Sequence, residues 1–296
     1  MNRTIVLLGP ADPKYQSTGV LKTDDAGRQR HEVNLKGLIP ILNFIENDPK
    51  LTTLCDCYIV GKHTIKPPPK GVGFNVLNLV GDADTSHDLL RKIQRLTGEI
   101  QPKKVFNKPS RVFRTTRTAL PETLAGIPGC RVPRVQNLDI FNFDELKNAC
   151  KEFGHWPMIL RARGFHGGQN MLKLEKPEEL ESIRDLVWLY QGILIMEFID
   201  SKTKGDLYQK NRIVVIDGKP HIRHSIFSDQ WCIHANSRSD LMNQDITLCR
   251  EEEKELSYWL DSGIKKHGKT IAAIHERIGL DVFGIDFAMC KDQMLI

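Results

Sequence analysis

The 296-residue sequence has no long apolar run. No stretch approaches the 18 apolar residues typical of a membrane-spanning helix, and the six residues from Thr4 to Gly9 are too few for a signal peptide's apolar region and cleavage site. The seven cysteines are odd in number and scattered, so we expect no disulfide framework. Cys55 and Cys57 lack a second pair of zinc ligands and fit alternate positions of a strand. We therefore expect a cytoplasmic protein without a membrane segment.

The sequence also lacks the compositional bias of disordered or fibrous chains. Its 22 Gly and 15 Pro are too few for a collagen-like or low-complexity protein, and 40% of the residues are hydrophobic. The length predicts about two domains, or one large one, with a sizeable core. No G-x-S-x-G motif is present, and nothing else indicates a Ser or Cys nucleophile.

Positive charge is concentrated in one segment. Between Gln101 and Arg134 the sequence has eight Lys or Arg residues and one acid, Glu122, although the whole chain carries only +5. A nucleic-acid surface would spread such charge along a face with interleaved aromatic residues. A single basic stretch instead favours a site for a small anion.

The first hundred residues alternate strand and helix patterns. Strands are expected at 4–8, 55–60, 74–80 and 104–107, and helices at 35–45 and 86–96. This alternation predicts an open parallel sheet. Asp82 and Asp84 precede the second helix and fit turn and capping roles better than a cation site.

The rest of the chain divides into a linker and a second module. Residues 110–134 read as a helical linker ending in the turn Gly126-Ile127-Pro128-Gly129, which gives expected domains at 1–109 and 135–296. Within 135–296, Asp217-Gly218 predicts a hairpin between two long strands. The remaining expected strands are 158–161, 170–174, 193–199, 282–289 and 294–296, and the expected helices are 143–153, 177–186, 251–262 and 270–277.

The segment from Gly263 to Thr270 matches the phosphate-loop pattern G-x-x-x-x-G-K-[ST]. A phosphate loop follows a buried parallel strand, whereas this segment follows the charged amphipathic helix pattern of residues 251–260. We therefore interpret it as a polar turn between helices. A phosphate-loop enzyme that uses Lys269 and Thr270 is the alternative.

A second glycine-rich segment has a more suitable context. Arg161 ends an apolar strand, and the loop after it contains Gly164, Gly167 and Gly168 before a second strand returns. Glycines allow a loop to fold its amides over an anion, next to the cation that the strand delivers. An ordinary hairpin without a ligand is the alternative.

With three further segments this loop resembles the ATP-grasp superfamily, the fold of D-alanine-D-alanine ligase and glutathione synthetase. The three segments are 194–200, 212–219 and 284–288. Other stretches are similar to the ATP-grasp domain attached to some bacterial tetratricopeptide-repeat proteins, although the repeats themselves are absent; these stretches are 79–84, 106–117, 124–129, 212–218 and 279–288.

The resemblance implies an α/β fold. An N-terminal open parallel-sheet domain, the pre-ATP-grasp domain, would be followed by a two-lobed α+β ATP-grasp module with ATP between the lobes. It also implies roles for ten residues. Arg117, Arg161, Gly164, Gly167 and Gly168 would bind the phosphates, Glu197, Phe198 and Ile199 would bind adenine, Arg212 would act on the phosphates or an acyl phosphate, and Asp286 would bind Mg²⁺.

The implied activity is ATP-dependent ligation of a carboxylate to an amine through an acyl phosphate. The expected partners are ATP, Mg²⁺ and a small-molecule or peptide carboxylate, without nucleic acid or membrane; a homodimer is compatible with this role. The family's remaining metal ligands are a Glu and an Asn on the strand after Asp286, and the sequence stops about two residues before the expected Glu. A non-catalytic ATP-binding module and an ATP-grasp phosphotransferase are the alternatives.

Several of these residues also have simpler interpretations. Glu197 could be an ordinary surface acid at a strand end, and Arg212 could form an ordinary salt bridge. His224 matches a family position near the cleft. Because His221 and His224 are three residues apart on a strand, we expect them on opposite faces, without a shared metal.

Overall fold

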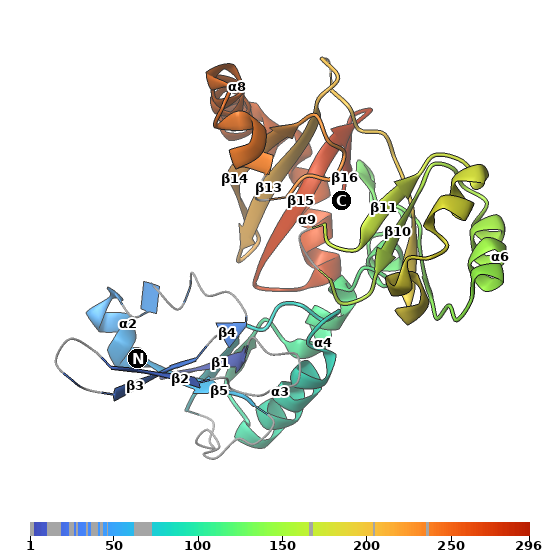
Figure 1. Cartoon of the computed structure of the whole chain (residues 1–296). Coiled ribbons are helices and arrows are strands. Elements are labelled where there is room, and N and C mark those ends of the chain that lie inside the picture. The colour runs from blue at the N-terminus through green and yellow to red at the C-terminus, as the bar shows by residue number, and fades with distance from the viewer. Residues whose placement is uncertain are drawn as a thin grey trace. The chain divides into compact units, whose positions relative to one another are not determined.

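The computed structural model describes residues 3–10, 19–23, 27, 29–33, 35–36, 41, 44–45, 47–61, 73–165, 168–203, 205–234 and 237–296. The chain forms two compact units. The first consists of Met1–Thr116 and Ile278–Asp281, and the second of Arg117–Arg277 and Val282–Ile296. The expected linker 110–134 is thus divided between the two units. Figure 1 shows the chain from its N-terminus in blue to its C-terminus in red.

The first unit is built on a five-stranded sheet with the order β4-β1-β6-β7, in which β5 also pairs with β1. Strands β5, β1, β6 and β7 are parallel, as the alternating pattern predicts, and β2 and β3 form a separate two-stranded sheet. Its elements are β1 (Thr4–Pro10), β2 (Gly19–Thr23), β3 (Gln29–Val33), β4 (Leu35–Lys36), α2 (Pro49–Leu54), β5 (Cys55–Ile59), β6 (Asn75–Asn78), α3 (His87–Ile100), β7 (Lys104–Phe106), α4 (Pro109–Val112) and the 3₁₀ turn η1 (Phe113–Thr115).

Helix α3 buries its apolar face in the first unit, where Leu89 lies next to Gly9 of β1. Leu89, Leu90 and Ile93 of α3 are buried, as the helical spacing predicts. Asp82 accepts from the backbone N–H of Asp84 at 3.0 Å, so it stabilises the turn before α3. The helix expected at 35–45 is wrong at its start, because residues 35–36 form β4 and pair with the end of β1.

The second unit contains two antiparallel sheets and the helices that cover them. Its elements are α5 (Leu120–Thr123), β8 (Cys130–Arg131), β9 (Val135–Leu138), α6 (Phe143–Phe153), β10 (Met158–Ala162), β11 (Met171–Leu174), the 3₁₀ segments η2 (Pro177–Ile183) and η3 (Val187–Gln191), β12 (Ile193–Glu197), β13 (Tyr208–Ile216), β14 (Lys219–Ser228), the π-helical turn η4 (Arg238–Met242), α8 (Ile246–Tyr258), the π-helical turn η5 (Trp259–Gly263), α9 (Ile264–Ile278, whose last residue belongs to the first unit), β15 (Val282–Cys290) and β16 (Gln293–Leu295).

The smaller sheet of the second unit has the order β11-β10-β12-β9. Buried residues alternate along β10 with half-buried ones, so one face packs on a core closed by α6, η2 and η3. Leu146 and Cys150 of α6, Leu160 of β10 and Leu189 of η3 are fully buried in this core. This packing holds the ends of β10 and β12 in fixed positions.

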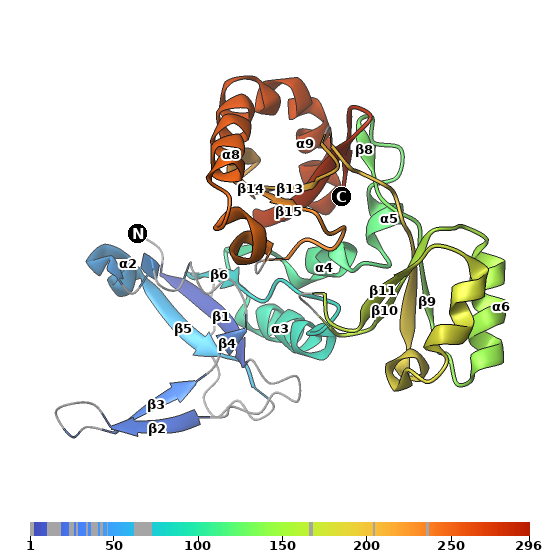
Figure 2. The same ribbon diagram turned by 45° about the horizontal axis from the view of Figure 1, so that its top comes forward.

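The larger sheet has the order β14-β13-β15-β16-β8. Figure 2 shows α8 and α9 on one side of it. Ile213, Val215 and Ile285 face these helices and are buried, whereas Arg212 and Asp286 lie on the other face. Among the described residues, no helix is both long and apolar enough to cross a membrane.

Candidate functional site

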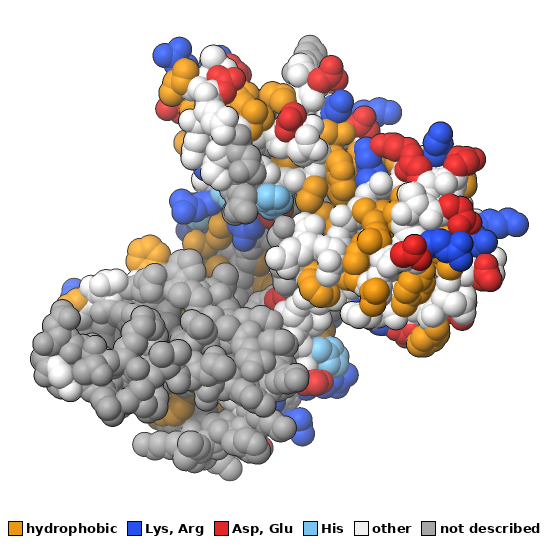
Figure 3. Space-filling model, in the orientation of Figure 1, with side chains coloured by type: hydrophobic (Ala, Val, Ile, Leu, Met, Phe, Trp, Pro, Cys, Tyr) orange, Lys and Arg blue, Asp and Glu red, His pale blue; other side chains and the backbone are white. Residues whose placement is uncertain are grey.

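A cavity of about 280 Å³ lies within the second unit. This volume is near the lower end for small-molecule sites, and most of the lining is apolar, as in such sites. Figure 3 shows hydrophobic side chains, in orange, among charged and other side chains on the described surface of the second unit. The lining residues are Pro133, Ile159, Met171, Met196, Glu197, Phe198, Ile199, Ser201, Tyr208, Gln209, Lys210, Trp231, Cys232, Ile233, Asp286, Phe287, Ala288 and Leu295.

Four of the ten predicted site residues line this cavity: Glu197, Phe198, Ile199 and Asp286. The first three stand where β12 ends, opposite the strands of the larger sheet. Sequence reasoning missed Lys210, on β13, and Trp231 and Cys232, which follow β14. The last two lie in an irregular segment without periodicity, so only their residue types could have singled them out.

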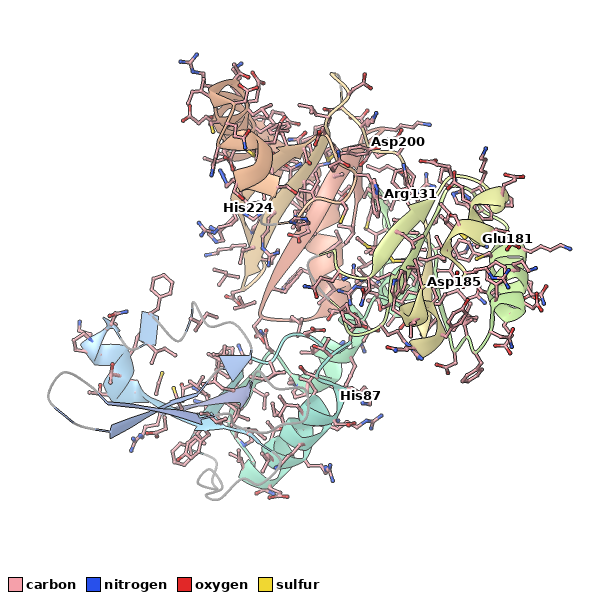
Figure 4. The ribbon with its side chains drawn as sticks, viewed as in Figure 1. His87, Arg131, Glu181, Asp185, Asp200 and His224 are labelled. Carbon is pink, nitrogen blue, oxygen red and sulfur yellow. The ribbon has the colours of Figure 1, made fainter. Side chains whose placement is uncertain are left out.

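Glu197 is fixed at the cavity wall by two donors. Its side chain is only 16% exposed. One carboxylate oxygen accepts from Nη2 of Arg131 at 2.8 Å, and the other accepts from the backbone N–H of Arg134 at 3.1 Å. Such a pre-paired carboxylate is better suited to orienting the backbone around a ligand than to being a free acceptor. Arg131 is labelled in Figure 4.

Arg161 lies at the end of β10 and braces the glycine-rich loop. Its Nη2 donates to the carbonyl of Phe165 at 2.7 Å. Gly164 and Gly168 adopt φ of 78° and 77°, a conformation that favours glycine, whereas Gly167 lies outside the described residues. An added Cβ on Gly168 would stand 3.0 Å from the sulfur of Cys232, so the described part of the loop lies against a cavity residue.

Two cations act on the thiol of Cys232. Burial raises the pKa of Cys232, and the charges of Arg161 and Lys210 oppose that rise. Lys210 lines the cavity. Arg161 does not line it, but its charge acts on Cys232, which does. Together with Asp286 they give this part of the cavity a polar, mainly cationic character, which suits a phosphorylated ligand.

Arg212 and Asp286 form an ion pair on the open face of the larger sheet. Nη1 of Arg212 donates to Oδ1 of Asp286 at 2.7 Å, and the two side chains are 38% and 45% exposed. Gly284, two residues before Asp286, makes room for the pair, because an added Cβ would stand 2.9 Å from Cζ of Arg212. The salt bridge is thus present, and it also holds a cation next to a cavity carboxylate.

His224 lies next to this pair across the sheet. Arg212 on β13 pairs with His224 of β14 on one side and with Asp286 of β15 on the other. Burial lowers the pKa of His224, and the carboxylate of Asp286 opposes this effect. Figure 4 labels His224 on its strand.

The expectation that His221 and His224 lie on opposite faces is wrong. His224 pairs with Arg212 and His221 pairs with Val214, which share one face of β13. The register shifts between these positions, so Arg223 is an extra residue in a β-bulge. A bulge changes the alternation of side chains along its strand. Among the described residues no group of three or more His, Cys, Asp or Glu could hold a metal ion.

Five predicted residues do not line the cavity. Arg161, Gly168 and Arg212 contact or act on residues that do, as described above. Gly164 is exposed in the loop, and Arg117 is half-buried between η1 and α5 at the start of the second unit.

The phosphate-loop match of residues 263–270 lies in a helix. Gly263 ends the π-helical turn η5, and α9 continues from Ile264, so the segment is neither a loop nor the turn between helices that we expected. The backbone amides of a helix interior are used in its own hydrogen bonds. The hydroxyl of Thr270 donates to the carbonyl of Pro128 at 2.9 Å. This segment therefore cannot cradle phosphates.

Similar solved structures reveal the fold. The chain is similar to D-alanyl-alanine synthetase A from Vibrio cholerae O1 biovar eltor, with 11% identity, a TM-score of 0.54 and coverage of 100% of this chain and 88% of that one. It is also similar to the ATP-grasp ligase PsnB in complex with a minimal precursor, with 12% identity and a TM-score of 0.51. This similarity covers 100% of this chain and 90% of PsnB. D-alanine-D-alanine ligase from Bacillus anthracis has 12% identity and a TM-score of 0.51, and the similarity covers 100% of this chain and 85% of the ligase.

The chain has the ATP-grasp fold. The predicted fold class, an open parallel sheet followed by a two-lobed α+β module, is confirmed. The sequence matches no protein-family profile and no curated protein. At 11% to 12% identity the similarity of structure concerns the fold, so the function has to be argued from the cavity.

Proposed function

We propose that the chain binds ATP in the cavity of the second unit and uses it to join a carboxylate to an amine. The observation that carries this proposal is the cavity itself, whose lining brings Glu197, Phe198 and Ile199 together with Lys210 and Asp286. Apolar walls with a fixed carboxylate suit a nucleoside base, and cationic side chains suit its phosphates. The resemblance to ATP-grasp domains of tetratricopeptide-repeat proteins, together with the fold, favours the same ligand.

In this proposal, the residues act mainly by position and charge. Arg161, with its Nη2 on the loop carbonyl of Phe165, and Lys210 offset the phosphate charge on one side. Arg212 stabilises the γ-phosphoryl group as its bond to ADP breaks and a bond to a substrate carboxylate oxygen forms, with ADP leaving with the electron pair. The amine then attacks the carbonyl carbon of the acyl phosphate and gives up a proton to water, the C–N bond forms as the C–O bond breaks, and phosphate leaves with the electron pair.

Asp286 fits a Mg²⁺ site of the minimal kind. This ion prefers oxygen ligands and is often held by one or two carboxylates together with substrate phosphates and water. Asp286 provides one carboxylate at the cavity, 45% exposed and hence accessible. When bound there, Mg²⁺ would neutralise phosphate charge.

A specific observation favours a second candidate, a non-catalytic ATP-binding module. Asp286 is already paired with Arg212 at 2.7 Å, and the described residues contain no cluster of three metal-ligating side chains. Such a site could bind ATP without turning it over. A phosphotransferase on the same fold is the third candidate, since it would need the same nucleotide contacts without the amine.

Two measurements test the proposal. Calorimetric titration with ATP and Mg²⁺ should detect binding that Asp286→Asn weakens, whereas Asp292→Asn, at an exposed aspartate paired with Lys266, should leave it unchanged. Incubation with ATP, Mg²⁺, hydroxylamine and a panel of amino acids and short peptides should trap the acyl phosphate as a hydroxamate. Binding without hydroxamate would favour the module, and no binding would refute ATP as the ligand.

A further inference from the structure

The segment from Asp229 to His234 links β14 to η4 and is anchored along its length. The backbone N–H of Gln230 donates to Oγ of Ser228 at 3.1 Å. Nζ of Lys210 donates to the carbonyl of Ile233 at 2.9 Å, and the N–H of His234 donates to Oγ of Ser237 at 3.2 Å. Trp231, Cys232 and Ile233 of this segment line the cavity. This segment is therefore a fixed part of the cavity wall.

Trp231 is the aromatic residue of this segment, and it stands next to the predicted adenine segment. Its ring contacts the ring of Phe198 edge to face, with centroids 6.0 Å apart and planes at 89°. Nζ of Lys173 lies over the ring of Phe198, 4.4 Å from the ring centroid. Phe198 is thus held by a cation–π contact while it supports Trp231, so the indole has a rigid neighbour.

The next residue, Cys232, lies close to positive charge. Cys232 is influenced by Arg161 and Lys210, the two cations proposed for the phosphates. Trp231 beside Phe198 and Cys232 beside two cations are therefore neighbours on the cavity wall. Such a wall suits a ligand that combines an aromatic base with negative charge.

We propose that Trp231 forms the aromatic wall of the base subsite and that a purine base stacks on it. The inference rests on the proposed ATP binding and adds a residue of this chain that the resemblance does not supply. Ile159, Met171 and Met196 also line the cavity and add apolar surface. Stacking on an aromatic ring is worth about 1 to 3 kcal/mol per base, which converts to about 5-fold to 150-fold in affinity.

Calorimetry on three variants tests this contact. Trp231→Leu should raise the Kd for ATP by about 5-fold to 150-fold, and Trp231→Phe should restore most of the affinity because the aromatic face remains. Trp188→Phe is the matched control, since this half-buried tryptophan packs against the core of the smaller sheet and does not line the cavity. Inorganic tripolyphosphate, which has no base, should bind wild type and Trp231→Leu equally.

Tryptophan fluorescence gives a second measurement. ATP should change the emission of wild type and of Trp188→Phe, and the change should be lost in Trp231→Phe. Unchanged ATP affinity in Trp231→Leu, or an equal loss for ATP and tripolyphosphate, would overturn the role of Trp231 while leaving ATP binding intact. Absence of ATP binding by the wild type would instead overturn the proposed function and this inference together.

Discussion

Arg161 provides a direct test of where the phosphates bind. Its guanidinium stands beside the cavity thiol of Cys232, and its bond to the carbonyl of Phe165 is a local contact with a residue that is 36% exposed. Water can replace that bond when Arg161 is removed. We therefore expect Arg161→Ala to affect ligand binding far more than folding.

The magnitude follows from the charge. A hydrogen bond to a charged group contributes about 1.5 to 3 kcal/mol, and part of this is offset because the phosphates regain water in the variant. We expect a loss of about 1 to 3 kcal/mol, which is about 5-fold to 150-fold in Kd. Arg161→Lys should fall between wild type and Arg161→Ala, because it keeps the charge and loses the planar fork.

Arg163→Ala is the matched control for this prediction. Arg163 has the same charge, two residues further along, but it is exposed and pairs with Asp139. The assay is calorimetric titration of ATP with Mg²⁺ at constant ionic strength, since general charge effects are screened equally in both variants. Equal weakening by Arg161→Ala and Arg163→Ala would refute a specific phosphate contact, and so would full affinity in Arg161→Ala.

Three further predictions concern the stability and reactivity of the second unit. Glu252→Gln should lower the free energy of unfolding by about 1 to 3 kcal/mol in urea, because buried Glu252 accepts from Ser225 and pairs with Arg238. Burial lowers the pKa of His267 from 6.5, so the unfolded chain binds a proton more readily than the native chain does. The free energy of unfolding should therefore fall as the pH drops below 6.5, and it should fall less in His267→Asn. Burial raises the pKa of Cys150 to about 12, so iodoacetamide at about pH 8 should label other thiols in the native protein and reach Cys150 only after unfolding, as mass spectrometry can show.

Local patterns predicted much of the fold because its elements depend on nearby residues. The Asp217-Gly218 hairpin forms as expected, with φ of 48° and 77° at its two central residues. Helix α6 begins at the side-chain cap of Asn142 and ends at Gly154, which has a φ of 64°. These signals are short in range, so they can be read from the sequence directly.

The parts that sequence reasoning missed depend on distant partners. The bulge at Arg223 changes the face of His224, and it is visible only once β13 and β14 are paired. Residues 177–183 form a 3₁₀ segment instead of an α-helix, packed through Leu180 on the core of the smaller sheet. Trp231 contacts Phe198, another residue of the cavity wall, although the two are 33 positions apart in the chain. Tertiary contacts decided each of these features.

The motif match of residues 263–270 illustrates the same limit, and Gly268 can test it. Two residues of the motif have simple structural explanations. Gly263 makes room for Trp259, because a Cβ added to the glycine would stand 2.8 Å from Cε3 of the tryptophan. Lys269 is exposed on the helix surface. Gly268 lies inside α9, where a Cβ added to it would point into open space.

Alanine at position 268 should therefore stabilise the protein by about 0.5 to 1 kcal/mol, because glycine is the weaker helix former and nothing would obstruct the methyl group. ATP binding should be unchanged in Gly268→Ala and in Lys269→Ala. A phosphate loop would give the opposite result, since it needs the glycine backbone and the lysine charge at these two positions. Urea unfolding and calorimetry on the two variants distinguish the alternatives, and loss of ATP binding in both would show that the helix is not the functional form of this segment.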